Sequence, residues 1–184
     1  MSFYSTSFGQ ISIGPKVGLN IADIKELSLP FSADNDFFNP KISYHIGGFI
    51  KIPTTEKTFL LGEIIYSRKG SRLRDQRGNR FNFELNYLTL PTLIGFQLND
   101  WSLFFGTELG IKVGDERLNS VIDFGIVGGA RYYIADKIQL GLRFIQGLTA
   151  LNNTGLVDGG GVTGLNRLRN QVWQLSLSYD LINI

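Results

Sequence analysis

The chain of 184 residues contains no cysteine and only one histidine, His45. Without cysteine there is no disulfide, thiolate metal site or cysteine nucleophile, and one histidine leaves too few ligands for a zinc site. Apolar residues never run for long enough to form a membrane-spanning helix. Charged residues make up 18% of the chain and the net charge is +2, which argues against a nucleic-acid-binding protein. The sequence therefore predicts no cofactor and no metal.

What the sequence has instead is a regular alternation of apolar and polar residues, interrupted by turn residues. A period of two is typical of β-strands with one apolar and one polar face. The apolar faces carry no charged residue in their central portions, as a lipid-facing surface requires, whereas the opposite faces carry charges and many glycines. The alternation predicts eight strands, at residues 10–21, 41–52, 58–71, 83–98, 101–112, 120–134, 138–147 and 169–181.

The connections between these segments alternate in length. The links at 53–57, 99–100 and 135–137 are short, and those at 23–40, 72–82, 113–119 and 148–168 are long. Short periplasmic turns and long extracellular loops are typical of Gram-negative outer-membrane barrels. The sequence thus predicts an all-β fold: an eight-stranded, antiparallel, up-and-down transmembrane β-barrel. We expect it in the cell outer membrane, with periplasmic termini and extracellular long loops.

The domain organisation is simple. Residues 1–9 end in a small-x-small pattern, Ser7 and Gly9, of the kind that precedes a signal-peptide cleavage site. We interpret residues 1–9 as the remnant of a signal peptide or a flexible N-terminus. Residues 10–184 are expected to form a single barrel domain.

Alternation alone does not tell which face of the barrel points outward. A soluble lipocalin-like barrel also has eight antiparallel strands, but its apolar face surrounds a ligand. Three features favour the membrane version: the glycine-rich polar faces suit a narrow interior, aromatic residues gather near both strand ends, and the polar faces carry both signs of charge. The soluble ligand-binding barrel is kept as an alternative.

Five short stretches occur in a regular order along the chain: GPKVGLN (14–20), EIIYSRKG (63–70), YLTLP (87–91), DFG (123–125) and GLTAL (147–151). Together they span nearly all of 10–181, and their order and spacing resemble the PorT-like outer-membrane β-barrel family of Bacteroidota. This family is similar to small eight-stranded barrels of the OmpA and OmpX kind. One member is implicated in type IX protein secretion, so the resemblance implies secretion-machinery proteins as partners.

Charged residues on the polar faces are the first set of candidate site residues. Carboxylates in such a set could serve acid–base chemistry, but no nucleophile or base accompanies them, so we predict no enzyme. Unpaired charge in a narrow interior is costly, and both signs are present. We therefore expect a connected ion-pair network that plugs the lumen, formed by Lys16, Glu63, Glu108, Asp123, Arg131 and Arg143.

The densest basic run is the second candidate set. Arg72, Arg74, Arg77 and Arg80 lie in a predicted outer loop, where arginine forks suit the phosphates of lipopolysaccharide. The alternative is a loop that is merely solvated. The favoured function is a non-catalytic outer-membrane barrel with a plugged polar lumen and a structural or interaction role. The alternatives are an accessory component of a type IX-like secretion system and a lipocalin-like ligand-binding barrel.

Overall fold

The computed structural model describes residues 10–26, 38–74, 80–113, 122–149 and 168–183. The described residues contain no helix, and hence none that is long and apolar enough to cross a membrane. They form the strands β1 (Ser12–Glu26), β2 (Phe38–Pro53), β3 (Thr58–Arg74), β4 (Arg80–Leu98), β5 (Trp101–Lys112), β6 (Ile122–Ala135), β7 (Ile138–Gly147), β8 (Leu168–Tyr179) and β9 (Ile182–Asn183).

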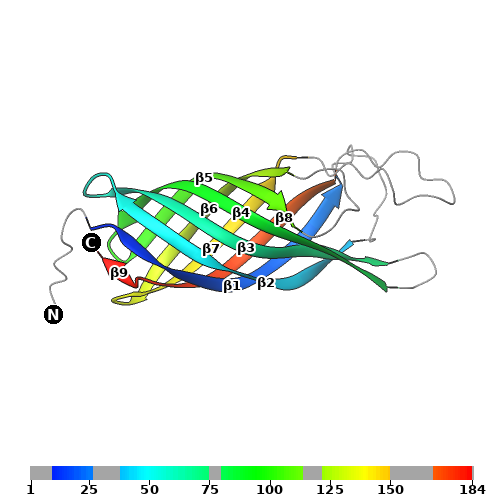
Figure 1. The fold of residues 1–184 in the computed structure, drawn as a ribbon, viewed down its shortest axis with the longest axis horizontal. Coiled ribbons are helices and arrows are strands. Elements are labelled where there is room, and N and C mark those ends of the chain that lie inside the picture. Colours follow the sequence, from blue (N-terminus) through cyan, green and yellow to red (C-terminus); the bar gives the residue numbers. More distant parts are fainter. Residues whose placement is uncertain (1–9, 27–37, 75–79, 114–121, 150–167, 184) are drawn as a thin grey trace.

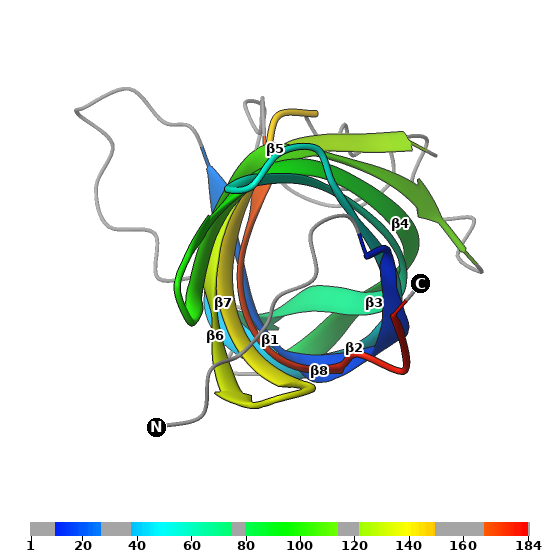
Figure 2. The same ribbon diagram turned by 90° about the vertical axis from the view of Figure 1, so that its left-hand side faces the viewer.

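The sheet closes on itself. Each strand from β2 to β8 pairs antiparallel with the next, and β1 pairs with both β8 and β2, so that the ring has no open side (Figure 2). The two-residue strand β9 pairs with the start of β1, Ser12 opposite Asn183, and so continues the course of β8 along the same neighbour. The predicted closed, eight-stranded, antiparallel barrel is confirmed.

The two ends of the barrel differ. Connections of four, two and two residues, 54–57, Asn99-Asp100 and Asp136-Lys137, lie at one end, where β1 begins and β9 ends (Figure 1). Asn99 has a φ of 54°, in the left-handed region that asparagine tolerates better than most residues, which suits a two-residue hairpin turn. The strands β1, β3, β5 and β7 end at the opposite end.

The strands are longer at that opposite end than the alternation predicted. Residues 23–40 and 72–82 were expected to be loops, but β1 runs to Glu26, β2 begins at Phe38, β3 ends at Arg74 and β4 begins at Arg80. Backbone pairing continues here, with Arg74 opposite Arg80. The prediction was wrong because Arg72, Arg74 and Arg80 have the parity of the lipid-facing positions, so the apolar face ends before the strands do; the apolar partners Leu73 and Phe81 have the other parity. With 17 and 19 residues, β3 and β4 are the longest strands and extend furthest at this end (Figure 1).

The outer wall of the barrel is apolar, as expected. Six residues that the alternation places in lipid are 42–58% exposed: Leu103, Phe105, Leu140, Leu142, Leu175 and Leu177. A wall of large exposed apolar side chains is stable only against hydrocarbon. The lipocalin-like alternative is wrong, because it needs these side chains inside the barrel.

The interior is less polar than the sequence analysis expected. A buried apolar cluster lies inside the wall beside the charged groups, and two of its aromatic rings, Phe49 and Phe59, lie against Gly14 and Gly95 of neighbouring strands. A Cβ at Gly95, for example, would collide with the ring of Phe59. Glycine-rich inner faces thus leave room for bulky partners, which fill the narrow interior. The cluster comprises Ala22, Phe49, Phe59, Leu61, Leu93, Phe104, Val127, Ile145 and Val172.

The outward position of Leu142 can be tested with a charge. Leu142→Arg should lower the free energy of unfolding in lipid vesicles by about 2–4 kcal/mol, because arginine near mid-membrane loses its hydration. Reversible urea unfolding in vesicles measures this change.

A matched control places the same charge close to the short-turn end. Leu181 follows β8 and is 60% exposed. Leu181→Arg should cost about 0–1 kcal/mol, because the side chain can reach the headgroups. Equal losses for the two variants would contradict this placement of the wall in the membrane.

Candidate functional site

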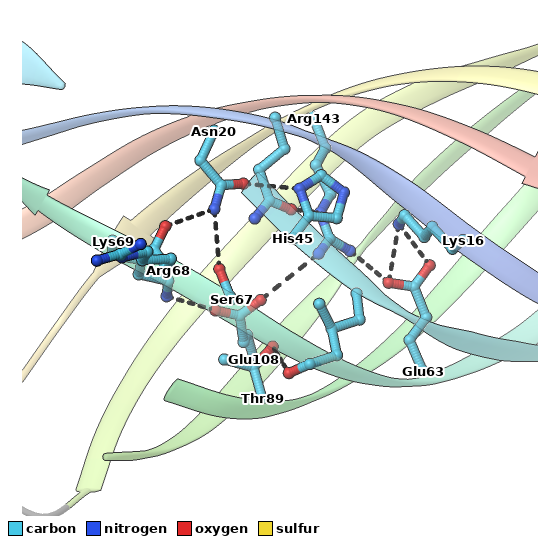
Figure 3. Close-up of polar contacts among 12 residues, drawn as sticks. Lys16, Asn20, His45, Glu63, Ser67, Arg68, Lys69, Thr89, Glu108 and Arg143 are labelled. Carbon is cyan, nitrogen blue, oxygen red and sulfur yellow. Dashed lines mark hydrogen bonds and ion pairs between the residues drawn. The ribbon is translucent and has the colours of Figure 1, made fainter. Parts of the chain in front are cut away.

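Glu63 lies at the centre of the barrel interior, on the inward face of β3. Its carboxylate accepts hydrogen bonds at 2.9 and 3.0 Å from the Lys16 ammonium of β1. The Arg143 guanidinium of β7 donates to it at 2.6 Å, and Arg131 of β6 donates to its other oxygen. All four side chains are buried. Figure 3 shows Lys16 and Arg143 converging on Glu63. One carboxylate therefore holds three cationic groups from three other strands.

A second carboxylate, Glu108 of β5, extends the group. The Lys69 ammonium of β3 donates to Glu108 at 2.8 Å. The Arg143 Nη2 atom lies 3.7 Å from the other oxygen of Glu108, so Arg143 connects the two carboxylates. We call Lys16, Glu63, Lys69, Glu108, Arg131 and Arg143 the lumen cluster.

Aromatic rings support the cations of the lumen cluster. The Arg131 guanidinium lies 5.5 Å from the centroid of Phe49 and 5.3 Å from that of Phe104. The Lys69 ammonium lies 5.1 Å from the ring of Tyr87. Cation–π contacts of this kind stabilise charges that have lost water. The apolar and the charged parts of the interior thus stabilise each other.

A neutral polar pair lies beside the lumen cluster. The Asn20 amide nitrogen faces three acceptors: the Tyr44 and Arg68 carbonyls and the Ser67 hydroxyl, at 3.2, 2.8 and 3.1 Å. This fixes the orientation of the amide, so its oxygen accepts from His45 Nδ1 at 2.8 Å. His45 thereby carries its proton on Nδ1, as a hydrogen-bonding group of the interior (Figure 3).

The structure can be compared with the six predicted lumen residues one by one. Five of them, Lys16, Glu63, Glu108, Arg131 and Arg143, are brought together in the lumen cluster. Asp123 is buried on β6, with its backbone opposite Gly110 of β5. Lys69 was not among the six, although strand parity puts it on the same face as Glu63.

The structure describes three of the four arginines in the basic run. Arg72 and Arg74 belong to β3 and Arg80 to β4, whereas Arg77 and the N-terminal residues 1–9 lie outside the described residues. Register sets Arg74 directly opposite Arg80, and Arg72 opposite Asn82. Three arginines thus belong to the ends of the paired strands β3 and β4, which the sequence analysis had expected to be a loop.

The chemistry of the site is electrostatic. Both carboxylates of the lumen cluster form ion pairs with buried cations. Among the residues that the structure describes, no three His, Cys, Asp or Glu side chains gather into a group that could hold a metal.

A closed barrel with an apolar wall and a buried charged interior defines the class of outer-membrane β-barrel proteins. Residues 3–153 match the family model of the outer membrane protein beta-barrel domain, and the chain belongs to this family. The protein is accordingly an outer-membrane protein. No curated protein matches the sequence.

Several solved structures share the fold. Neisserial surface protein A has a TM-score of 0.60 at 10% identity, with 93% of this chain and 99% of that chain covered. OprG from Pseudomonas aeruginosa has a TM-score of 0.52 at 11% identity, with 93% and 95% covered. Ail, the attachment invasion locus protein of Yersinia pestis, solved in complex with the heparin analogue sucrose octasulfate, has a TM-score of 0.52 at 12% identity, with 93% and 97% covered.

The central role of Glu63 can be tested by removing its charge. Glu63→Gln leaves three buried cations without their carboxylate, and should lower the free energy of unfolding by about 3–5 kcal/mol. Denaturant unfolding of the refolded barrel in detergent measures the loss.

The exposed Glu56 in the turn between β2 and β3 offers the same substitution without burial. Glu56→Gln should change stability by less than about 0.5 kcal/mol. If Glu63→Gln were as mild as Glu56→Gln, the lumen cluster would not hold the interior together.

Proposed function

We propose that this protein is a non-catalytic outer-membrane barrel with a plugged lumen and a structural or interaction role. The observation that carries the proposal is the lumen cluster, whose members on β1, β3, β5, β6 and β7 meet across the interior. An eight-stranded barrel is only wide enough for its side chains to fill. Side chains that meet across such an interior leave no room for a wide aqueous channel.

The absence of catalysis is part of this proposal. A general acid or base must be able to exchange a proton with a substrate. Glu63 and Glu108 are buried and bound to ammonium or guanidinium groups, which keeps them from that role.

We further propose that the end with short turns faces the periplasm and the end with long connections faces outward. The support is the contrast in connection length between the two ends, which is typical of this class. The β3–β4 hairpin would then extend from the cell surface.

The outward hairpin is proposed to contact lipopolysaccharide through Arg72, Arg74, Arg77 and Arg80. Like charges at directly opposite positions of a sheet repel each other, and Arg74 lies opposite Arg80. A phosphate group bound between them would remove this repulsion through paired hydrogen bonds. Ail, a barrel of the same fold, was solved with a polyanion, the heparin analogue sucrose octasulfate. We therefore expect a polyanionic ligand at this end.

A second candidate function is that of an accessory component of a type IX-like secretion system. It is supported by the sequence stretches that resemble PorT-like barrels, such as residues 63–70 and 87–91. Co-purification from native membranes distinguishes the two, because an accessory component would bring secretion proteins with it.

The plugged lumen predicts very low conductance. In planar lipid bilayers the intact protein should show no stable openings in the nanosiemens range, because charged side chains occupy the centre of the barrel. Single-channel recording measures this, and stable nanosiemens openings of the intact barrel would refute the plug.

The hairpin predicts salt-sensitive binding of lipopolysaccharide. Replacing Arg72, Arg74, Arg77 and Arg80 together with Gln should weaken binding at least about tenfold, since each charged contact is worth roughly 1 kcal/mol at a membrane surface. Raising the salt concentration should weaken the parent in the same way. Titration of detergent-solubilised protein with lipopolysaccharide measures the affinity.

The control removes positive charge at the other end of the barrel. Lys57 and Lys137 are exposed in the short turns. Lys57→Gln with Lys137→Gln should leave lipopolysaccharide binding unchanged. If the arginine variant bound as tightly as the parent, the hairpin would be merely solvated.

A further inference from the structure

The apolar outer wall ends in polar residues at the end with long connections. On four strands the outward-facing series passes there from an aromatic or leucine side chain to a half-buried polar one. A change of this kind on a lipid-facing surface marks the edge of the hydrocarbon. The pairs are Tyr66 and Arg68 on β3, Leu88 and Asn86 on β4, Phe144 and Gln146 on β7, and Trp173 and Gln171 on β8.

Arg68 differs from the other three polar residues because it is charged. Among the outward-facing strand residues whose side chains the structure describes, it alone carries a charge. Ile46 of β2 pairs with Tyr66, so Tyr44 and Arg68 are the next outward residues of the two strands towards this end. Tyr44 is 46% exposed. Tyrosine prefers the membrane–water interface, so its presence beside Arg68 places the guanidinium at the level of the lipid headgroups.

The backbone of Arg68 is held from inside the barrel. The pairing of β2 with β3 shifts register between Pro40 and His45. Here the Arg68 carbonyl accepts hydrogen bonds from side chains, namely the Asn20 amide at 2.8 Å and the Ser43 hydroxyl (Figure 3). Asn20 is buried. The position of Arg68 on the outer wall is therefore fixed by a residue of the interior.

Arg68 lies well below the arginines at the ends of β3 and β4. Arg74 is six positions further along β3, which is roughly 20 Å at about 3.3 Å per residue. With a strand tilt of about 40°, this is roughly 15 Å along the membrane normal. The separation is too large for both guanidinium groups to contact one phosphate.

We propose that Arg68 binds a phosphate of lipid A, the acylated and phosphorylated sugar that anchors lipopolysaccharide in the outer leaflet. The inference rests on the proposed function, in which this end faces outward and contacts lipopolysaccharide. It assigns that contact to two heights: lipid A phosphate at Arg68, and phosphates of the outer saccharide at the hairpin arginines. A guanidinium has five N–H donors, so Arg68 can bind a phosphate while it keeps contacts within the protein.

The test uses lipid A itself, which lacks the outer saccharide, as the probe. Detergent-solubilised full chain is titrated with lipid A. Arg68→Gln should weaken the affinity about fivefold, the effect of losing one charged contact at a membrane surface. Arg68→Lys should keep part of the affinity, because the charge remains but the planar fork is lost. Unchanged binding of lipid A by Arg68→Gln would overturn the proposal.

Two comparison variants make the test specific. The hairpin variant, with Arg72, Arg74, Arg77 and Arg80 replaced by Gln, should bind lipid A like the parent and complete lipopolysaccharide more weakly. Lys137→Gln removes an exposed charge at the other end and should leave lipid A binding unchanged.

The two proposals can fail separately. If the hairpin variant lost affinity for lipid A and Arg68→Gln did not, the site at Arg68 would be overturned and the hairpin contact would stand. If Arg68→Gln lost affinity for lipid A and the hairpin variant bound complete lipopolysaccharide like the parent, only the hairpin contact would be overturned.

A second measurement tests the membrane level of Arg68 without any ligand. The chain has no cysteine, so Ile64→Cys and Arg72→Cys each create a single site for a nitroxide spin label. Ile64 is 54% exposed on the outer wall, and Arg72 has the same parity on β3. In lipid vesicles the label at 64 should be accessible to oxygen and the label at 72 to a water-soluble nickel complex. A label at 72 that lies in the hydrocarbon would overturn the placement.

Discussion

Closure of the sheet between β1 and β8 is the constraint on which the rest of this structure depends. In the hydrocarbon core of a membrane no water is available to satisfy backbone N–H and C=O groups, so a sheet is stable there only without edges. The first strand meets this requirement by pairing with β2 on one side and with β8 on the other. Once the ring is closed, alternate side chains are divided strictly between lipid and interior.

The interior then has to be filled with the side chains that face it. The interior is filled in two ways, by apolar rings and by paired charges. Glycines such as Gly95 leave room for rings such as that of Phe59, and charged groups from several strands meet at Glu63. Buried charges are tolerated only when they are paired and hydrogen-bonded. The rings of Phe49 and Phe104 beside Arg131 show that the two solutions are not separate.

The barrel architecture could be predicted because its two determinants, a period of two and the alternation of loop lengths, are local in sequence. Strand ends beyond the apolar wall could not, since residues such as Arg74 and Arg80 put charge at positions with the lipid-facing parity while the backbone pairing continues. Parity also identified Glu63 and Arg143 as inward residues. It could not tell that Arg143 would reach both carboxylates, or that Lys69 would join them, because such contacts depend on the stagger of distant strands.

The contacts of Glu63 also bear on the kinetics of the barrel. Its partners Lys16, Arg131 and Arg143 are 47, 68 and 80 positions away in the sequence. Lys16 lies on β1, which is separated from β3 by β2 alone, but Arg131 on β6 and Arg143 on β7 reach Glu63 across the interior, which requires the sheet to have curled round. Interactions that are absent from the transition state leave the folding rate unchanged and slow unfolding. We therefore expect the contacts of Glu63 with Arg131 and Arg143 to form late in folding, so that they lower the unfolding rate of the barrel and leave its folding rate nearly unchanged.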